Sequence, residues 1–80
     1  PLLIAEVLSP STQRHDRGDK RLAYASLSSL QEYLLIAQDQ PRVDVLRRTT
    51  GWAVETLTGP DGQLHLTSVD FSISLAELYE

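Results

Sequence analysis

Glu6 is the residue whose surroundings are hardest to reconcile with its chemistry. It lies inside the apolar run 2–8, and burying a carboxylate is costly unless a cation, a metal ion or hydrogen-bond donors meet it. Strand alternation places it on one face with three aliphatic side chains, Leu2, Ile4 and Leu8. It also lies near the strand's end, where α/β sheets open ligand crevices. Position alone supports two interpretations equally. One is a ligand site; the other is a structural role, in which this face is partly solvated or an N-terminal segment outside these residues pairs with Glu6.

A basic cluster follows this strand. Four of the seven basic residues lie within eight positions: Arg14, Arg17, Lys20 and Arg21. Two acids share that stretch, so residues 14–21 carry a net charge of +2 (four cations less two acids). The remaining residues carry a net charge of −6, which gives the total of −4. For any single arginine, a solvated helix face is the simpler explanation. For the cluster beside Glu6, we favour a shared site for a carboxylate and several cations.

Other combinations of reactive residues are weaker. Ser9, His15 and Asp16 include the residue types of a hydrolase triad, but the sequence has no G-x-S-x-G turn to expose the serine. His15 and His65 are not spaced as metal ligands. The absence of cysteine excludes disulfides, thiolate zinc sites and cysteine nucleophiles, and suits a reducing cytoplasm.

Length and composition limit the organisation. The 80 residues are 41% hydrophobic and 22% charged, which predicts a single globular domain over 1–80. No apolar run approaches the roughly 18–20 residues that cross a bilayer, so no membrane association is expected. The chain starts at Pro1 rather than methionine, and we expect this domain to be partial, with the N-terminal part of its fold outside these residues.

The hydrophobic pattern predicts an α/β fold. The expected elements are a strand at 2–8, a helix at 16–30, strands at 33–37, 43–46, 52–57 and 64–66, and a short helix from 75. A strand, a helix and a strand within about 38 residues fit a βαβ crossover, which makes the two strands parallel. The later strands, separated by turns, form an antiparallel hairpin extension. Ser74 and Glu77 form a capping box at the start of the last helix.

Two motifs of this chain resemble those of a known family. The string LIAEVLSPST at 3–12, followed by DRGDK at 16–20 and by Tyr24, resembles the signature of the Uma-two family of restriction endonucleases. That family belongs to the PD-(D/E)XK nuclease superfamily. The segments 30–34 and 75–79 are also similar, so the resemblance covers essentially the whole chain. It implies a restriction-endonuclease-like mixed sheet.

The resemblance also implies roles for individual residues. Glu6 matches the acidic member of the (D/E)XK element, but Leu8 stands where the lysine is expected, and Lys20 is the matching lysine. Mg²⁺ would be held by Glu6, by the Val7 carbonyl and by an aspartate on a preceding strand that has no counterpart here. Lys20 would orient the attacking water or neutralise charge on the phosphoryl oxygens. Three arginines would contact DNA phosphates: Arg14, Arg17 and Arg21.

The function implied by the resemblance is Mg²⁺-dependent endonucleolytic hydrolysis of DNA phosphodiester bonds. We expect the 80 residues alone to be inactive, because the implied aspartate is absent. The alternative is a non-catalytic interaction module derived from a degenerate nuclease. Such a module could form a homodimer through exposed edge strands between 43 and 66. A simpler third interpretation is a small α/β fold in which Glu6 is salt-bridged to Lys20.

Overall fold

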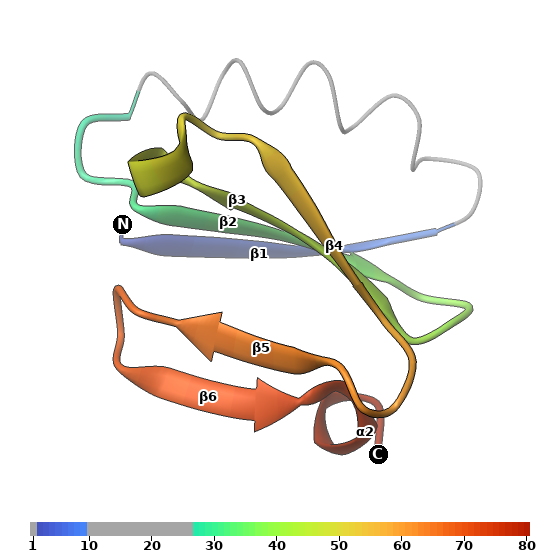
Figure 1. Ribbon diagram of the computed structural model, residues 1–80. Coiled ribbons are helices and arrows are strands. Elements are labelled where there is room, and N and C mark those ends of the chain that lie inside the picture. Colours follow the sequence, from blue (N-terminus) through green and yellow to red (C-terminus); the bar gives the residue numbers. More distant parts are fainter. Residues whose placement is uncertain (1, 10–26) are drawn as a thin grey trace.

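The computed structural model describes residues 2–9 and 27–80 (Figure 1). A four-stranded mixed sheet holds most of its buried apolar side chains. The strands, in spatial order, are β1 (Leu3–Leu8), β2 (Glu32–Ala37), β3 (Arg42–Arg47) and β4 (Val54–Thr58). β1 and β2 are parallel, as the sequence predicts, and the other two pairs are antiparallel. Residues 10–26 lie outside the described part, so the crossover helix itself stays a prediction.

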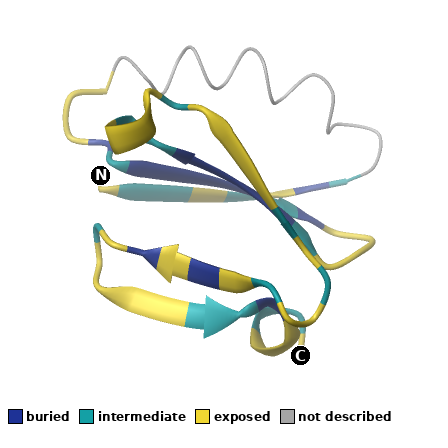
Figure 2. Cartoon of the chain, in the orientation of Figure 1, coloured by how far each residue is buried: buried dark blue, intermediate teal, exposed yellow. Residues whose placement is uncertain are grey.

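The two central strands are the most deeply buried. β2 is apolar at consecutive positions from Tyr33 to Ala37, so it can be covered on both faces, and five of its six residues are buried. The edge strands are more exposed, and β4 has four exposed residues among its five (Figure 2). The sheet therefore presents two edges, formed by β1 and β4, on either side of a buried centre.

A second layer covers one face of the sheet. β5 (Gln63–Leu66) and β6 (Phe71–Ser74) form a separate antiparallel hairpin, followed by the short helix α2 (Leu75–Leu78) (Figure 1). The side chains that join the two layers are buried: Leu34, Val43, Val45, Leu64, Leu66 and Leu75. The sequence pattern placed 64–66 at the end of a single antiparallel extension and predicted no strand at β6. That expectation was wrong because the apolar face of the sheet needs a cover, which a further strand in the same sheet could not supply.

The strand predicted at 52–57 begins two residues later than expected. A 3₁₀ turn, η1 (Arg48–Thr50), leads into Gly51 and Trp52, which have φ angles of 66° and 65°. Both residues therefore occupy the left-handed region, which cannot continue a β-strand. Pairing with β3 starts only at Val54. The described end of the predicted helix is likewise not helical, because residues 28 and 29 form a turn.

The C-terminal helix begins where its sequence predicts. The Ser74 hydroxyl accepts a hydrogen bond from the Glu77 amide (3.2 Å), and the Glu77 carboxylate accepts one from the Ser74 amide (3.4 Å). Just beyond the helix, the Tyr79 hydroxyl lies 2.6 Å from the Ala37 carbonyl oxygen, to which it donates. The chain end is thereby attached to the β2–β3 hairpin. No helix in residues 2–9 and 27–80 is long and apolar enough to cross a membrane.

Candidate functional site

Glu6 lies on the face of the sheet opposite to the β5–β6 layer. Its register partner in β2 is Leu35, which belongs to the apolar cluster of that face. Leu8 is buried in the same cluster and Ile4 packs against it. Glu6 itself is half-buried and makes a polar or electrostatic interaction, so it is not a bare charge in an apolar core. The alternation predicted for this strand is therefore confirmed, and the carboxylate lies near the strand's carboxyl end.

A second carboxylate lies in the same row of the sheet. Asp44 in β3 is the register partner of Leu35 on the side away from β1, so it points to the same face as Glu6. It is only 1% exposed, and its Oδ1 accepts a hydrogen bond from Thr56 Oγ1 at 2.8 Å. Arg42 Nε lies 3.8 Å from the same oxygen. Two strand spacings, about 10 Å, separate the backbones of the two acids, so Asp44 is not adjacent to Glu6.

The other residues assigned from the sequence are only partly within the described structure. The Val7 side chain is 66% exposed and alternates to the face opposite Glu6, while its carbonyl follows Glu6 directly in the chain. Four cationic residues lie outside the described residues: Arg14, Arg17, Lys20 and Arg21. Their placement near Glu6 stays a prediction. Within residues 2–9 and 27–80, no three His, Cys, Asp or Glu residues cluster as metal ligands.

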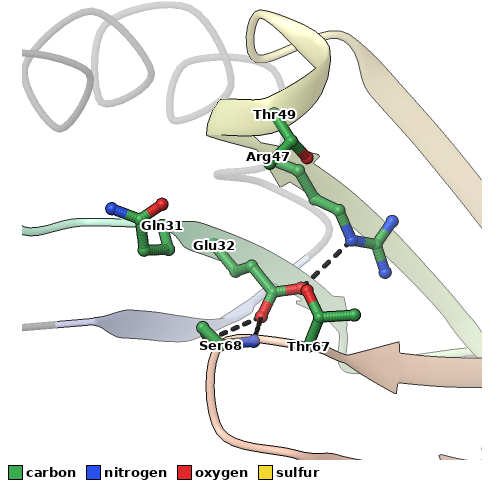
Figure 3. Close-up of a pocket in the computed structure, with 6 residues that line it drawn as sticks. All are labelled: Gln31, Glu32, Arg47, Thr49, Thr67 and Ser68. Atoms are coloured by element: carbon green, nitrogen blue, oxygen red, sulfur yellow. Dashed lines mark hydrogen bonds and ion pairs between the residues drawn. The ribbon is translucent and has the colours of Figure 1, made fainter.

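A buried acid that the sequence analysis did not single out lies on the other face. Glu32, at the start of β2, is 2% exposed. Its Oε1 accepts hydrogen bonds from the Ser68 amide (2.9 Å) and the Ser68 hydroxyl (2.5 Å), and its Oε2 accepts one from Arg47 Nε (3.0 Å). Figure 3 shows the carboxylate between the β5–β6 connection and the arginine. Glu32 thus attaches the hairpin tip to the sheet.

Arg47 connects this acid to two further groups. Its Nη1 donates to Glu55 Oε2 (2.6 Å) on β4, and its Nη2 donates to the His65 carbonyl oxygen on β5. A pocket of about 100 Å³ lies beside the network, lined by Gln31, Glu32, Arg47, Thr49, Thr67 and Ser68. Because three donors already occupy both oxygens of Glu32, this carboxylate holds the two layers together and does not offer a metal ligand.

The environment of Glu32 keeps it ionised. Burial raises its pKa, but hydrogen bonds from the side chain and backbone of Ser68 and from Arg47, with the charge of Arg47, outweigh that effect. The net result is a pKa below the ordinary value of a glutamate. A carboxyl group whose pKa falls on folding stabilises the folded state when the pH is above its pKa in the unfolded chain, which is about 4.3 for glutamate. That stabilisation is lost as the pH falls through the lower pKa of the folded state.

Acid is therefore expected to weaken the attachment of the hairpin. The free energy of unfolding of the wild-type chain should exceed that of a Glu32→Gln variant at about pH 7, and the difference should shrink as pH falls from about 5 to about 3. Urea unfolding at several pH values, followed by the fluorescence of Trp52, the single tryptophan, measures this difference. A difference that stays constant across that range would contradict the role given to the Glu32 charge.

Two curated proteins of Synechocystis sp. (strain ATCC 27184 / PCC 6803 / Kazusa) are similar to this chain. Uncharacterized protein slr1290 is 35% identical over 81 residues, which cover 99% of this chain and 42% of that protein. Uncharacterized protein sll1609 is 36% identical over 69 residues, covering 84% of this chain and 39% of that protein. The chain thus spans about two fifths of the length of the curated relatives it matches.

The fold has a counterpart among solved structures. A crystal structure described as that of "a putative nuclease belonging to DUF820" from Anabaena variabilis ATCC 29413 superposes with a TM-score of 0.75 at 22% sequence identity. The match covers 99% of this chain and 44% of that one. The profile of the Uma2 family, described as "Putative restriction endonuclease", matches residues 1–76. With the signature around Glu6, that match means that this chain belongs to the Uma2 family.

Proposed function

We propose that this protein hydrolyses DNA phosphodiester bonds with Mg²⁺, and that Glu6 is the metal-binding carboxylate within this chain. The observation that carries the proposal is the half-buried Glu6 near the carboxyl end of β1, in a member of the Uma2 family. An acid among the aliphatic side chains of its own strand is costly unless it binds a ligand or has a polar partner. Asp44 and Glu32 are fully buried, at 1% and 2% exposed, whereas Glu6 is half-buried, so Glu6 is more accessible to a ligand than either of them.

The donor chemistry around Glu6 fits magnesium. Mg²⁺ prefers oxygen ligands and is commonly held by one or two carboxylates with water and phosphate oxygens. The Glu6 carboxylate and the Val7 carbonyl are ligands of that kind. Residues 2–9 and 27–80 hold no group of three acidic or histidine ligands, so a second carboxylate would come from another part of the protein. Bound there, the metal would polarise the phosphate and activate a water. Lys20 would orient that water or neutralise charge on the phosphoryl oxygens. Arg14, Arg17 and Arg21 would hold DNA phosphates without reading sequence.

We further propose that a strand outside these 80 residues completes the site. Among the described residues, β1 pairs with β2 on one side only, and both Ala5 and Val7 are exposed. The curated relatives are more than twice as long as the stretch they share with this chain. A strand added to the open edge of β1 would cover these apolar side chains. It would also bring the aspartate that the family resemblance implies next to Glu6.

The test compares the 80-residue chain with the full-length gene product. Supercoiled plasmid is incubated with each protein in Mg²⁺, in Mn²⁺ or with EDTA, and Mg²⁺ binding is measured by calorimetry. The full-length protein should nick the plasmid in Mg²⁺ and not in EDTA, whereas the 80-residue chain should not cleave. A full-length protein that binds no divalent metal and cuts no DNA would disprove the nuclease proposal. Metal-dependent cleavage by the short chain would disprove only the need for a further strand.

A further inference from the structure

Within residues 2–9 and 27–80, the edge strand β4 is open on one side, and the charge of Glu55 is the one feature of its sequence that opposes pairing with another chain. It lies at the end of the sheet opposite to β1, and four of its five residues are exposed, including Val54 at 51%. Natural edge strands usually carry charged side chains, especially lysine, or a proline or a bulge that blocks further pairing. The sequence VETLT contains no lysine or proline, and its register with β3 runs without interruption.

We propose that two copies of this chain pair through antiparallel β4 strands, with the twofold axis at Thr56. In this register Thr56 faces Thr56 of the partner subunit, Val54 faces Thr58 of the partner subunit, and Glu55 faces Leu57 of the partner subunit. All five residues of the strand are then paired. A twofold axis at Glu55 would pair fewer residues, because Leu57 and Thr58 of each strand would face positions outside β4.

The side chains of β4 fit this register on both faces. Glu55 is already neutralised within its own chain, because Arg47 donates to it at 2.6 Å. The opposite face carries Val54 and Thr58, both exposed and β-branched, a type that favours cross-strand pairing. The Thr56 hydroxyl donates a hydrogen bond to buried Asp44, so the orientation of its side chain is already fixed in the single chain.

The dimer interface lies at the edge of the sheet opposite to the strand that carries Glu6. Joining the described strands of two copies through β4 makes a continuous eight-stranded sheet in which each β1 is the strand farthest from the interface. Because the interface involves β4 and not Glu6, the dimer proposal holds whether or not the chain is a nuclease. Because a five-residue strand pair buries little surface, the dimer should be weak, and protein concentrations up to about 1 mM are needed to populate it.

The experiment is sedimentation equilibrium of the 80-residue chain with charge variants of the edge. The wild-type mass should rise from 8.9 kDa towards twice that value with concentration. A Val54→Lys/Thr58→Lys variant places lysine opposite lysine at two points and should raise the dimer dissociation constant at least about tenfold. A Val54→Glu/Thr58→Lys variant places opposite charges at the same points and should dimerise at least as well as wild type at low salt.

A matched control carries the same two added charges elsewhere. Gln63→Lys/Thr67→Lys changes two exposed residues away from β4 and should dimerise like wild type. A wild-type chain that stays monomeric up to about 1 mM would overturn the proposal. So would a dilysine edge variant that dimerises as wild type does. If the glutamate–lysine variant is folded by circular dichroism yet as monomeric as the dilysine variant, the register is wrong.

Discussion

Replacing Glu6 with glutamine is expected to reduce Mg²⁺-dependent DNA cleavage by the full-length protein on the order of 10²–10³-fold, the loss typical of removing one group that stabilises transition-state charge. Glutamine has nearly the same shape as glutamate but lacks the negative charge that would hold the metal. Initial rates of plasmid nicking over a range of Mg²⁺ concentrations measure the effect. Affinity for Mg²⁺ should fall together with the rate.

The control for this substitution is Asp61→Asn, which removes an equal charge from an exposed turn. Its cleavage rate should match that of the wild type. Glu6 is half-buried on an edge strand, so Glu6→Gln should unfold at a urea concentration close to that of the wild type. Unchanged cleavage in a folded Glu6→Gln protein would show that this acid does not hold the metal.

Replacing Glu32 with alanine should remove a large part of the stability of the chain. The substitution removes the carboxylate that accepts hydrogen bonds from the Ser68 amide and from Arg47 Nε. Breaking a buried charge pair in this way lowers the free energy of unfolding by about 3–5 kcal/mol. A domain of this size has roughly 4–12 kcal/mol in total. The free energy of unfolding in urea, followed by Trp52 fluorescence, measures the loss.

Arg47 provides a matched control, because it binds a second, exposed acid. Its Nη1 lies 2.6 Å from Glu55, whose side chain is 56% exposed, whereas the Glu32 side chain is 2% exposed. Glu55→Ala should therefore cost no more than about 1 kcal/mol, as for other exposed ion pairs. Equal losses for the two variants would mean that burial does not strengthen the Glu32 network.

Local sequence features predicted much of this protein. The parallel pairing of β1 with β2 follows from two apolar runs at crossover spacing, and the capping box at Ser74 and Glu77 depends on residues only three positions apart. The family was also readable, because the string around Glu6 is contiguous. Glu6 stood out for the same reason: an acid among consecutive aliphatic residues is visible without knowing what packs against them.

Only the tertiary structure decided which other acids are buried and how the layers are arranged. Asp44 alternates with Val43 and Val45, which in sequence is typical of a strand with one solvated face, yet it is 1% exposed. Glu32 finds its partners at Arg47 and Ser68, which are 15 and 36 positions away. Hydrophobic periodicity reports which residues of one element share a face. Burial and charge pairing depend on which element covers that face, and contacts between distant parts of the chain determine this.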